Sequence, residues 1–301
     1  MRFSLRHLEI FVAVARAGSI SVAATELAMS QSAASTALIE LERRYGRSLF
    51  DRSGKRLKIN ETGRSLLVPA LELLSRAQEI DGLLAGRTGP GPLHLGATQT
   101  IGSYVAPRLI NAYTRQHEGC ALTLDIGNTA EIASGIIDFS LDLALVEGVH
   151  AHPDLVVTDW LDDELVLICA ASHRLAGRKA WGVDDVLTEG WVVREKGSGT
   201  RQTLDTAMRP YWSRWRIELE LEQIEAILEM VAVSSLIGCV PRVAAQQFLA
   251  QGRVAEIGIA ELDLRRRFYI MMHKGKYLTA GIRAFLAICE VARQAADGAG
   301  P

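Results

Sequence analysis

A proline- and glycine-rich segment, RTGPGP at residues 87–92, divides the 301-residue chain into parts with different hydrophobic periodicity. Two prolines that alternate with two glycines end any helix, because proline lacks an N–H and clashes with the preceding turn. Before this segment apolar residues recur at helical spacing, and after it strand-like and helix-like stretches alternate. The pattern therefore predicts a helical N-terminal unit followed by an α/β C-terminal unit.

Short helices with clear end signals are expected before residue 60. Leu5–Ala17 has the apolar spacing of an amphipathic helix and ends at Gly18. Ser19 can cap a second helix, and Ser30 can cap a third that ends at Gly46. Two short helices joined by a tight turn, the second with a polar face, form a helix-turn-helix arrangement.

A hairpin and a long helix complete the N-terminal part. The stretch SLFDRSGKRLKINETG alternates basic and apolar residues about a Ser53-Gly54 turn, as a two-stranded hairpin does. Asn60 can cap a helix from Glu61 to about Leu84. Because an apolar stripe on so long a helix usually packs against a partner, we expect a second copy of the chain there.

The third helix is suited to enter the major groove of DNA. Short polar side chains on its face opposite Leu38 and Leu41 can contact base edges, and the basic residues that follow can neutralise phosphates. The alternative is a plain three-helix unit with a polar surface. The predicted DNA-binding residues are Gln31, Ser32, Ser35, Thr36, Arg43, Arg52, Lys55 and Arg56.

Charge is distributed unevenly along the chain. Residues 1–89 hold 13 basic and 9 acidic residues, which leaves 20 basic and 26 acidic residues in the remainder from totals of 33 and 35. Eight of the basic residues lie between Arg43 and Arg64. A solvated charged face is one explanation, but a basic unit attached to an acidic remainder is more typical of a module that binds a polyanion.

The pattern AAxxLxxSQSAxSxxLxxLE, followed by LFDR and INETG, resembles the N-terminal winged helix of LysR-type transcriptional regulators. The resemblance extends over the whole chain and implies a winged helix-turn-helix at 1–60 and a linker helix with hinge at 61–89. It further implies a two-lobed α/β effector domain at 90–301, similar to type 2 periplasmic binding proteins. Lobe I would comprise about 90–162 and 268–301, and lobe II about 163–267.

The resemblance also implies partners. The partners are promoter DNA and a small-molecule effector, with RNA polymerase as a further candidate. Two copies of the chain would form a dimer through the linker helix, and such dimers are often paired into a tetramer. The sequence departs from the family at Thr36, Ile39 and Glu40, where basic or polar residues are common. We therefore expect Gln31, Ser32 and Ser35 to contact bases, while the basic residues of the predicted hairpin, which is the wing of the winged helix, contact phosphates.

Eight strands are expected after residue 90, with helices between several of them, which predicts an α/β architecture with mainly parallel sheets. They lie at residues 92–97, 121–127, 141–148, 164–170, 190–195, 216–223, 235–241 and 268–274.

Three strand-to-helix junctions in this part are rich in hydroxyl and amide groups. They are ATQTIGSYVAP, GNTAEI and REKGSGTRQ, and each places backbone N–H groups at a helix start. In open α/β sheets, ligands bind at the carboxyl ends of strands. Ordinary helix capping is the alternative for each junction alone. The predicted effector-binding residues are Thr98, Gln99, Thr100, Ser103, Asn128, Thr129, Glu195, Ser198 and Thr200.

These donors suggest an anionic effector: a small carboxylate, a phosphorylated metabolite or an inorganic sulfur oxyanion. Arg194, Lys196 and Arg201 could add positive charge, whereas Glu195 opposes it. Aromatic residues are scarce at the junctions, which makes a large aromatic effector less suitable.

Other classes of protein fit the sequence less well. An enzyme would need a nucleophile or acid–base motif, but the histidines show none, and the carboxylates Asp162-Asp163 and Asp184-Asp185 are expected in loops or at helix starts. A solute-binding protein would lack residues 1–89, and a DNA-architectural protein would need no cleft. The four separated cysteines predict buried thiols of a cytosolic protein, with neither structural zinc nor a disulfide set. No cofactor is expected, and the resemblance implies a bacterial cytoplasmic protein that is associated with the nucleoid when it is bound to DNA.

Overall fold

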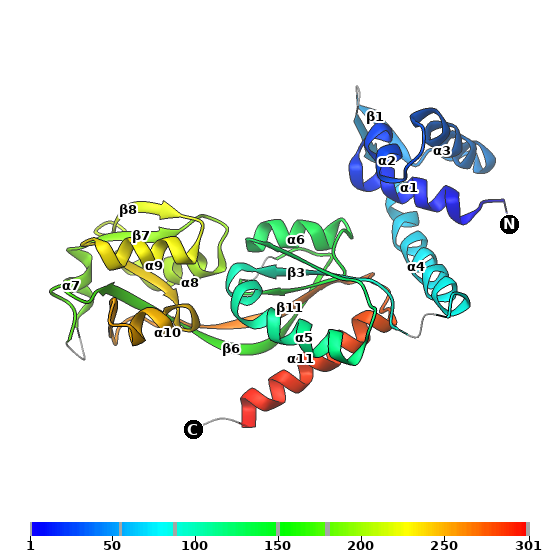
Figure 1. The fold of residues 1–301 in the computed structure, drawn as a ribbon. Helices are drawn as coiled ribbons and strands as arrows, with labels where there is room; N and C mark the ends of the chain where they lie inside the picture. Colours follow the sequence, from blue (N-terminus) through cyan, green and yellow to red (C-terminus); the bar gives the residue numbers. More distant parts are fainter. Residues whose placement is uncertain (1, 54–55, 87–88, 149–150, 178–180, 299–301) are drawn as a thin grey trace.

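The computed structural model describes residues 2–53, 56–86, 89–148, 151–177 and 181–298. The N-terminal unit consists of α1 (Leu5–Ala17), α2 (Ile20–Glu26), α3 (Gln31–Tyr45), β1 (Phe50–Ser53) and β2 (Arg56–Ile59). Figure 1 shows these elements as a compact group at one end of the molecule.

The helix ends follow the local capping chemistry. Ser4 and His7 form a capping box at the start of α1, and Gly18 ends that helix with a φ of 61°. The Ser30 hydroxyl accepts a hydrogen bond from the Ala33 amide at 3.2 Å and so caps α3. Ser19 occupies the N-cap position of α2, but its side chain makes no capping hydrogen bond. The position of the α2 cap was therefore predicted correctly, but the side-chain hydrogen bond expected from Ser19 is not formed.

Small residues allow the helices of this unit to cross closely. Phe11 is fully buried beside Ala23, Ala24 and Ala34, and its ring centroid lies 5.7 Å from that of Phe50 in the hairpin. One contact can therefore fix the wing against the helices. Tyr45, the last residue of α3, is 50% exposed.

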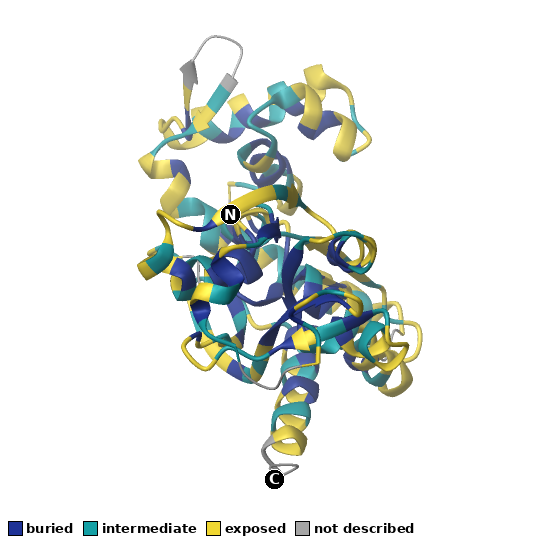
Figure 2. Cartoon of the chain, turned by 90° about the vertical axis from the view of Figure 1, so that its left-hand side faces the viewer, coloured by how far each residue is buried: buried dark blue, intermediate teal, exposed yellow. Residues whose placement is uncertain are grey.

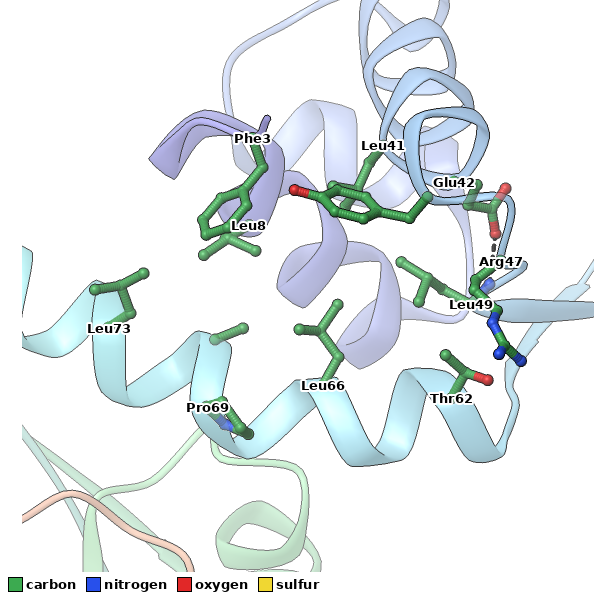
Figure 3. Close-up of a pocket in the computed structure, with 12 residues that line it drawn as sticks. Phe3, Leu8, Leu41, Glu42, Arg47, Leu49, Thr62, Leu66, Pro69 and Leu73 are labelled. Carbon is green, nitrogen blue, oxygen red and sulfur yellow. Dashed lines mark hydrogen bonds between the residues drawn. The ribbon is translucent and has the colours of Figure 1, made fainter. Parts of the chain in front are cut away.

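The long helix α4 (Glu61–Leu84) begins at Asn60, whose side-chain oxygen accepts a hydrogen bond from the Gly63 amide at 2.9 Å. Its first half packs against α1 and leaves an apolar groove of about 350 Å³. Figure 3 shows Leu66, Pro69 and Leu73 on one side of the groove, facing Phe3, Leu8 and Leu41. Farther along α4 the apolar residues Ile80, Leu83 and Leu84 are exposed.

The C-terminal half is built around a mixed sheet. Its strands are β3 (Leu93–Thr98), β4 (Leu122–Gly127), β5 (Leu143–Val146), β6 (Leu155–Ala170), β7 (Gly190–Arg194), β8 (Arg216–Leu221), β9 (Ile237–Pro241), β10 (Val254–Ile257) and β11 (Arg265–His273). The hydrogen-bonded order is β4-β3-β5-β11-β6-β9-β7-β8, with β10 paired to β6. The helical elements are η1 (Ile101–Val105), α5 (Ala106–Gln116), α6 (Thr129–Ile137), α7 (Val183–Leu187), α8 (Gly199–Met208), η2 (Arg209–Tyr211), α9 (Ile224–Val233), α10 (Arg242–Ala250) and α11 (Ala280–Gly298).

The prediction of mainly parallel sheets requires correction. β3 pairs in parallel with β4 and β5, and β7 does so with β8 and β9. However, β11 pairs antiparallel with β5 and β6, and β6 pairs antiparallel with β9 and β10. The reason is that β6 and β11 return the chain between two separate parallel units.

Those units are two lobes joined by the long strands β6 and β11 (Figure 1). One lobe holds a core that includes Leu95, Leu143 and Phe285, and the other is centred on Trp191 and Ile237. Figure 2 shows the buried residues gathered along the sheet and the inner sides of its helices. The proposed lobe boundaries, between 162 and 163 and between 267 and 268, fall within β6 and β11 and stay a prediction.

The N-terminal unit and α4 both contact the C-terminal half. Arg16 of α1 donates a hydrogen bond to the carbonyl of Phe139 at 2.6 Å. Glu79 of α4 accepts hydrogen bonds from the Ala280 amide at 2.9 Å and from the Tyr277 hydroxyl at 3.2 Å. These contacts tie both α1 and the linker helix to the effector half.

Among the described residues, no helix has the length and apolar character required to cross a lipid bilayer. Cys169, Cys239 and Cys289 are buried, and Cys120 is partly buried. Burial raises the pKa of Cys289 to about 12, so its thiol stays protonated.

Candidate DNA-binding surface and interlobe site

The predicted reading residues lie together on one face of α3. Gln31, Ser32 and Thr36 are exposed and Ser35 is partly buried, whereas Leu38 on the opposite face is in the core. The Ser32 hydroxyl lies 3.1 Å from that of Ser30 at the start of the helix. The face thus presents short polar side chains, as the groove of DNA requires.

The basic residues near α3 differ in how they are held. Arg43 is exposed at the end of the helix. Arg44 is engaged inside the unit, since it donates to the Arg2 carbonyl at 2.8 Å and pairs with Glu40. The hydrogen bond from Arg44 is also the main reason that the pKa of Glu40 is lowered. Arg44 is therefore less available for phosphate than its sequence position suggests.

The remaining basic residues predicted to bind DNA are in the hairpin. The backbones of Arg52 and Arg56 belong to β1 and β2, which pair through Arg52 with Leu57 and through Ser53 with Arg56. The side chains of Arg52 and Arg56, and the whole of Lys55, lie outside the described residues.

A second group of polar residues lies buried where the two lobes meet. We call it the interlobe cluster; its members are Thr98, Thr100, Thr129, Glu147, Asp163, Arg194, Ser198, Thr200 and Arg266. All are buried except Asp163, whose side chain is 11% exposed. Burial of so many polar groups is costly unless each has a partner.

Glu147, which follows β5, is the centre of the cluster. Its carboxylate accepts hydrogen bonds from the Thr100 amide at 2.6 Å and from Arg266 Nη1 at 2.9 Å, and its own amide donates to Thr98 Oγ1 at 3.1 Å. Thr200 Oγ1 is 3.4 Å away. Burial raises the pKa of Glu147, but Arg266, the hydrogen bonds from Thr100 and the charge of Arg194 outweigh burial and hold the pKa below its usual range.

Arg266 of β11 joins the lobes through the cluster. It pairs with Asp163 of β6 at 2.6 Å, donates to Thr200 Oγ1 at 2.9 Å and reaches Thr100 Oγ1 at 3.3 Å. Thr100 precedes η1 and Thr200 belongs to α8, so one guanidinium contacts both lobes. Burial raises the pKa of Asp163 despite the neighbouring Arg266.

The lobes touch closely at two glycines beside Glu147. A Cβ atom on Gly199 would lie 2.8 Å from the Gly148 amide nitrogen, and one on Gly148 would lie 3.1 Å from Thr129 Oγ1. The starts of α6 and α8 therefore meet against the end of β5. A larger residue at either position would therefore require neighbouring atoms to shift, and at Gly199 the nearest of those atoms are backbone atoms.

Two polar atoms of the cluster have no hydrogen-bond partner among the described residues, namely Thr129 Oγ1 and Arg194 Nη1. The other nitrogens of Arg194, Nε and Nη2, donate to Glu195 at 2.8 and 2.9 Å. Buried polar groups without a partner are rare, so both atoms mark places where a further group can bind.

The other predicted effector residues lie around the cluster. Asn128 caps α6 through the Glu131 amide at 3.0 Å, and Gln99 donates to Gln223 of the opposite lobe at 2.9 Å. Ser103 is exposed on η1, and Glu195 is held by Arg194. Of the nine predicted residues, Thr98, Thr100, Thr129, Ser198 and Thr200 belong to the cluster itself.

Of the charged members of the cluster, only Arg194 was a candidate from the sequence, as a source of positive charge; Glu147, Asp163 and Arg266 were not predicted to belong to the site. Asp163, expected in a loop, lies within β6 because that strand extends from Leu155. Glu147 stands at the carboxyl end of a buried strand, a signal that could have identified it. Arg201, a candidate cation, is instead paired with Asp205 at 2.7 Å and Glu220 at 2.9 Å.

Known protein families match both halves of the chain. A family described as bacterial regulatory helix-turn-helix proteins of the lysR family matches residues 5–64, and the LysR substrate binding domain matches residues 86–293. The chain belongs to the LysR family of transcriptional regulators. It is thus a DNA-binding regulator with an effector-binding domain, and not an enzyme, as predicted.

Relatives and solved structures agree with this assignment. The chain is 35% identical to YeiE of Escherichia coli, an uncharacterized HTH-type regulator, over 97% of this chain and 99% of that one. A full-length OxyR variant of Pseudomonas aeruginosa has the same fold, with a TM-score of 0.72 at 20% identity, over 97% of this chain and 95% of that one. The regulatory domain of Synechocystis CcmR, in complex with 2-PG, gives a TM-score of 0.63 at 27% identity over 68% and 98%.

Proposed function

We propose that this LysR-family regulator responds to a small anion bound in the interlobe cluster. The observation that carries the proposal is the convergence of buried donors from both lobes on one point: the Thr100 amide, the hydroxyls of Thr100 and Thr200, and Arg266. Hydrogen bonds that involve a charged group are stronger than neutral ones, and a water-free site strengthens them further. The effector would contact Thr98, Thr100, Thr129, Ser198 and Thr200, with Gln99, Asn128, Ser103 and Glu195 nearer the rim.

The ligand bound by a similar domain supports an anionic effector. The structure of the CcmR regulatory domain, 27% identical over 68% of this chain, holds 2-PG. A neutral aromatic effector is the second candidate class, but the cluster offers charged groups and hydroxyls, with no aromatic side chain among its members.

For DNA, two sets of residues would have different roles. Gln31, Ser32, Ser35 and Thr36 would contact base edges from α3, while Arg43, Arg52, Lys55 and Arg56 would contact phosphates. Promoter DNA would then hold the regulator at the nucleoid, where RNA polymerase is a candidate partner.

A dimer through α4 is part of the proposal, with a tetramer as the larger assembly. Leu73, Ile80 and Leu84 are exposed, and the first two are seven residues apart on one side of the helix. A seven-residue apolar spacing is typical of helices that pack along each other. The groove beside Leu66 and Pro69 would extend this apolar surface (Figure 3).

Calorimetric titration of the full-length protein tests the effector class. Sulfate, inorganic phosphate and 2-PG are the probes, and we expect saturable heat with at least one of them. The same anion should change the affinity for a DNA fragment upstream of the regulator's own gene. Heat with a neutral aromatic compound, and none with the three anions, would refute the anion proposal.

A further inference from the structure

The Glu147 carboxylate occupies the point on which the donors of the proposed anion site converge. The Thr100 amide lies 2.6 Å from Oε1, while Arg266 Nη1 lies 2.9 Å from Oε2. These donors come from the start of η1 and from β11, and Thr200 of α8 lies 3.4 Å from Oε2. A carboxylate of the protein is therefore held as a bound carboxylate ligand would be.

The charges of the cluster leave no room for a second anion beside Glu147. Arg266 faces two acids, Glu147 and Asp163, and Arg194 is paired with Glu195. Counted together with Glu195 at its edge, the cluster has three acidic groups, Glu147, Asp163 and Glu195, against the two arginines. Burial of a further uncompensated charge is strongly unfavourable, so an anion can bind at Arg266 only if a carboxylate leaves that guanidinium for another cation.

Arg194 provides a place for a displaced carboxylate. Its Nη1 atom is buried without a partner among the described residues, although the other two nitrogens are bound to Glu195. Arg194 also lies close enough to Glu147 for its charge to contribute to the lowered pKa of that residue. A buried N–H without an acceptor gains a charge-assisted hydrogen bond if a carboxylate reaches it.

We infer that Glu147 is an internal occupant of the effector site, and that an anionic effector displaces it from the Thr100 amide and Arg266 toward Arg194. The inference rests on the anion site proposed above and specifies how that site is regulated. Glu147 then limits the affinity for the effector, because the effector binds only if the Thr100 amide and Arg266 hold it more tightly than they hold the Glu147 carboxylate. Glu147 also selects against neutral ligands, which cannot replace its charge beside Arg266.

Full-length Glu147→Gln tests the inference. Glutamine keeps the shape of the side chain and an acceptor for the Thr100 amide but removes the charge that competes for Arg266. Titrated with sulfate, inorganic phosphate and 2-PG, the variant should bind at least one anion roughly ten- to a hundredfold more tightly than the natural protein. Glu220→Gln is the matched control, because Glu220 is 44% exposed and pairs with Arg201 outside the cluster.

A double-mutant cycle with Arg194→Gln identifies the destination of the carboxylate. Without Arg194 the displaced Glu147 has no cation to receive it, so this change should weaken anion binding by roughly tenfold in the natural background. In the Glu147→Gln background the same change should have little effect. A purely structural role of Arg194 would give the same loss in both backgrounds.

The outcomes separate this inference from the anion proposal. If the natural protein binds an anion and folded Glu147→Gln binds it equally or more weakly, the inference is wrong and the anion site stands. If neither protein binds any of the three anions, both are wrong. Should Glu147→Gln fail to fold, Glu147→Asp replaces it: a shorter side chain that reaches Arg266 less well should also tighten anion binding, and unchanged or weaker binding would overturn the inference.

Discussion

The polar face of α3 and the interlobe cluster use similar residues in opposite surroundings. On α3, Gln31, Ser32 and Thr36 are exposed to solvent and can adapt to a base sequence. In the cluster, Thr100 and Thr200 are almost fully buried and already hydrogen-bonded to Glu147 and Arg266. A surface that reads DNA need only exchange water for its partner, whereas a buried site must exchange one protein contact for another.

The largest effect should follow from removal of the cation that holds the cluster. Arg266→Met leaves Glu147 and Asp163 buried without a counter-charge, which should destabilise the effector domain by about 3–5 kcal/mol. Urea unfolding measures this loss. Arg267→Met is the control, since Arg267 makes exposed ion pairs with Asp159 and Asp162. Equal losses in the two variants would show that burial does not distinguish the cluster from a surface.

A smaller effect is expected where the lobes touch. Gly199→Ala places a methyl group 2.8 Å from the Gly148 amide nitrogen, and such overpacking costs about 1–3 kcal/mol. The closed arrangement should become less populated, so the Thr100 amide should exchange its hydrogen faster. Gly182→Ala, where the nearest atom would be 3.7 Å from the new Cβ, serves as control. An unchanged exchange rate would mean that the lobes do not meet at Gly199 in solution.

On the exposed face of α3, Gln31→Ala should lower the discrimination between operator and random DNA by about 1–3 kcal/mol. The free energy of unfolding should change little, because the side chain is exposed. Anisotropy titrations with both DNA types measure the difference. Gln246→Ala on α10, also exposed, should leave it unaltered. An equal loss on both kinds of DNA would contradict base reading by Gln31.

The smallest effect should come from the wing. Arg52→Ala should weaken specific and random DNA alike and reduce the salt slope of binding by about one, as titrations at several salt concentrations would measure. Arg115→Ala on α5 removes the same charge from the effector half and should leave the slope unchanged. If Arg52→Ala altered only operator binding, the wing would be reading sequence rather than neutralising charge.

Local signals in the sequence predicted the N-terminal unit well. Glycine and capping residues set the ends of α1, α3 and α4, because those ends depend on a few neighbouring atoms. The two-lobed effector half followed from the resemblance and from strand patterns. β10 and the first half of β6 were not predicted. In β6 the reason is that the stretch LVVTDWLDD mixes apolar and acidic residues, in a strand that joins both lobes.

The interlobe cluster could be predicted only in part. Thr98, Thr129 and Ser198 lie at strand-to-helix junctions, which are recognisable from short motifs. Arg266 and Glu147 are 119 residues apart, and nothing local to either position indicates the other. Their pairing depends on β11 crossing between the lobes, a property of the whole topology.

The contact between Gly148 and Gly199 has a kinetic consequence. Because Glu147, Thr100 and Thr200 are buried while the lobes touch, an effector that binds there as proposed can enter only when the lobes separate. The observed association rate should therefore rise with effector concentration and then level off at the rate of opening. The measured dissociation constant would equal the intrinsic one divided by the fraction of open molecules. If the effector binds at the proposed site, the speed of the regulator's response depends on a contact between two residues without side chains.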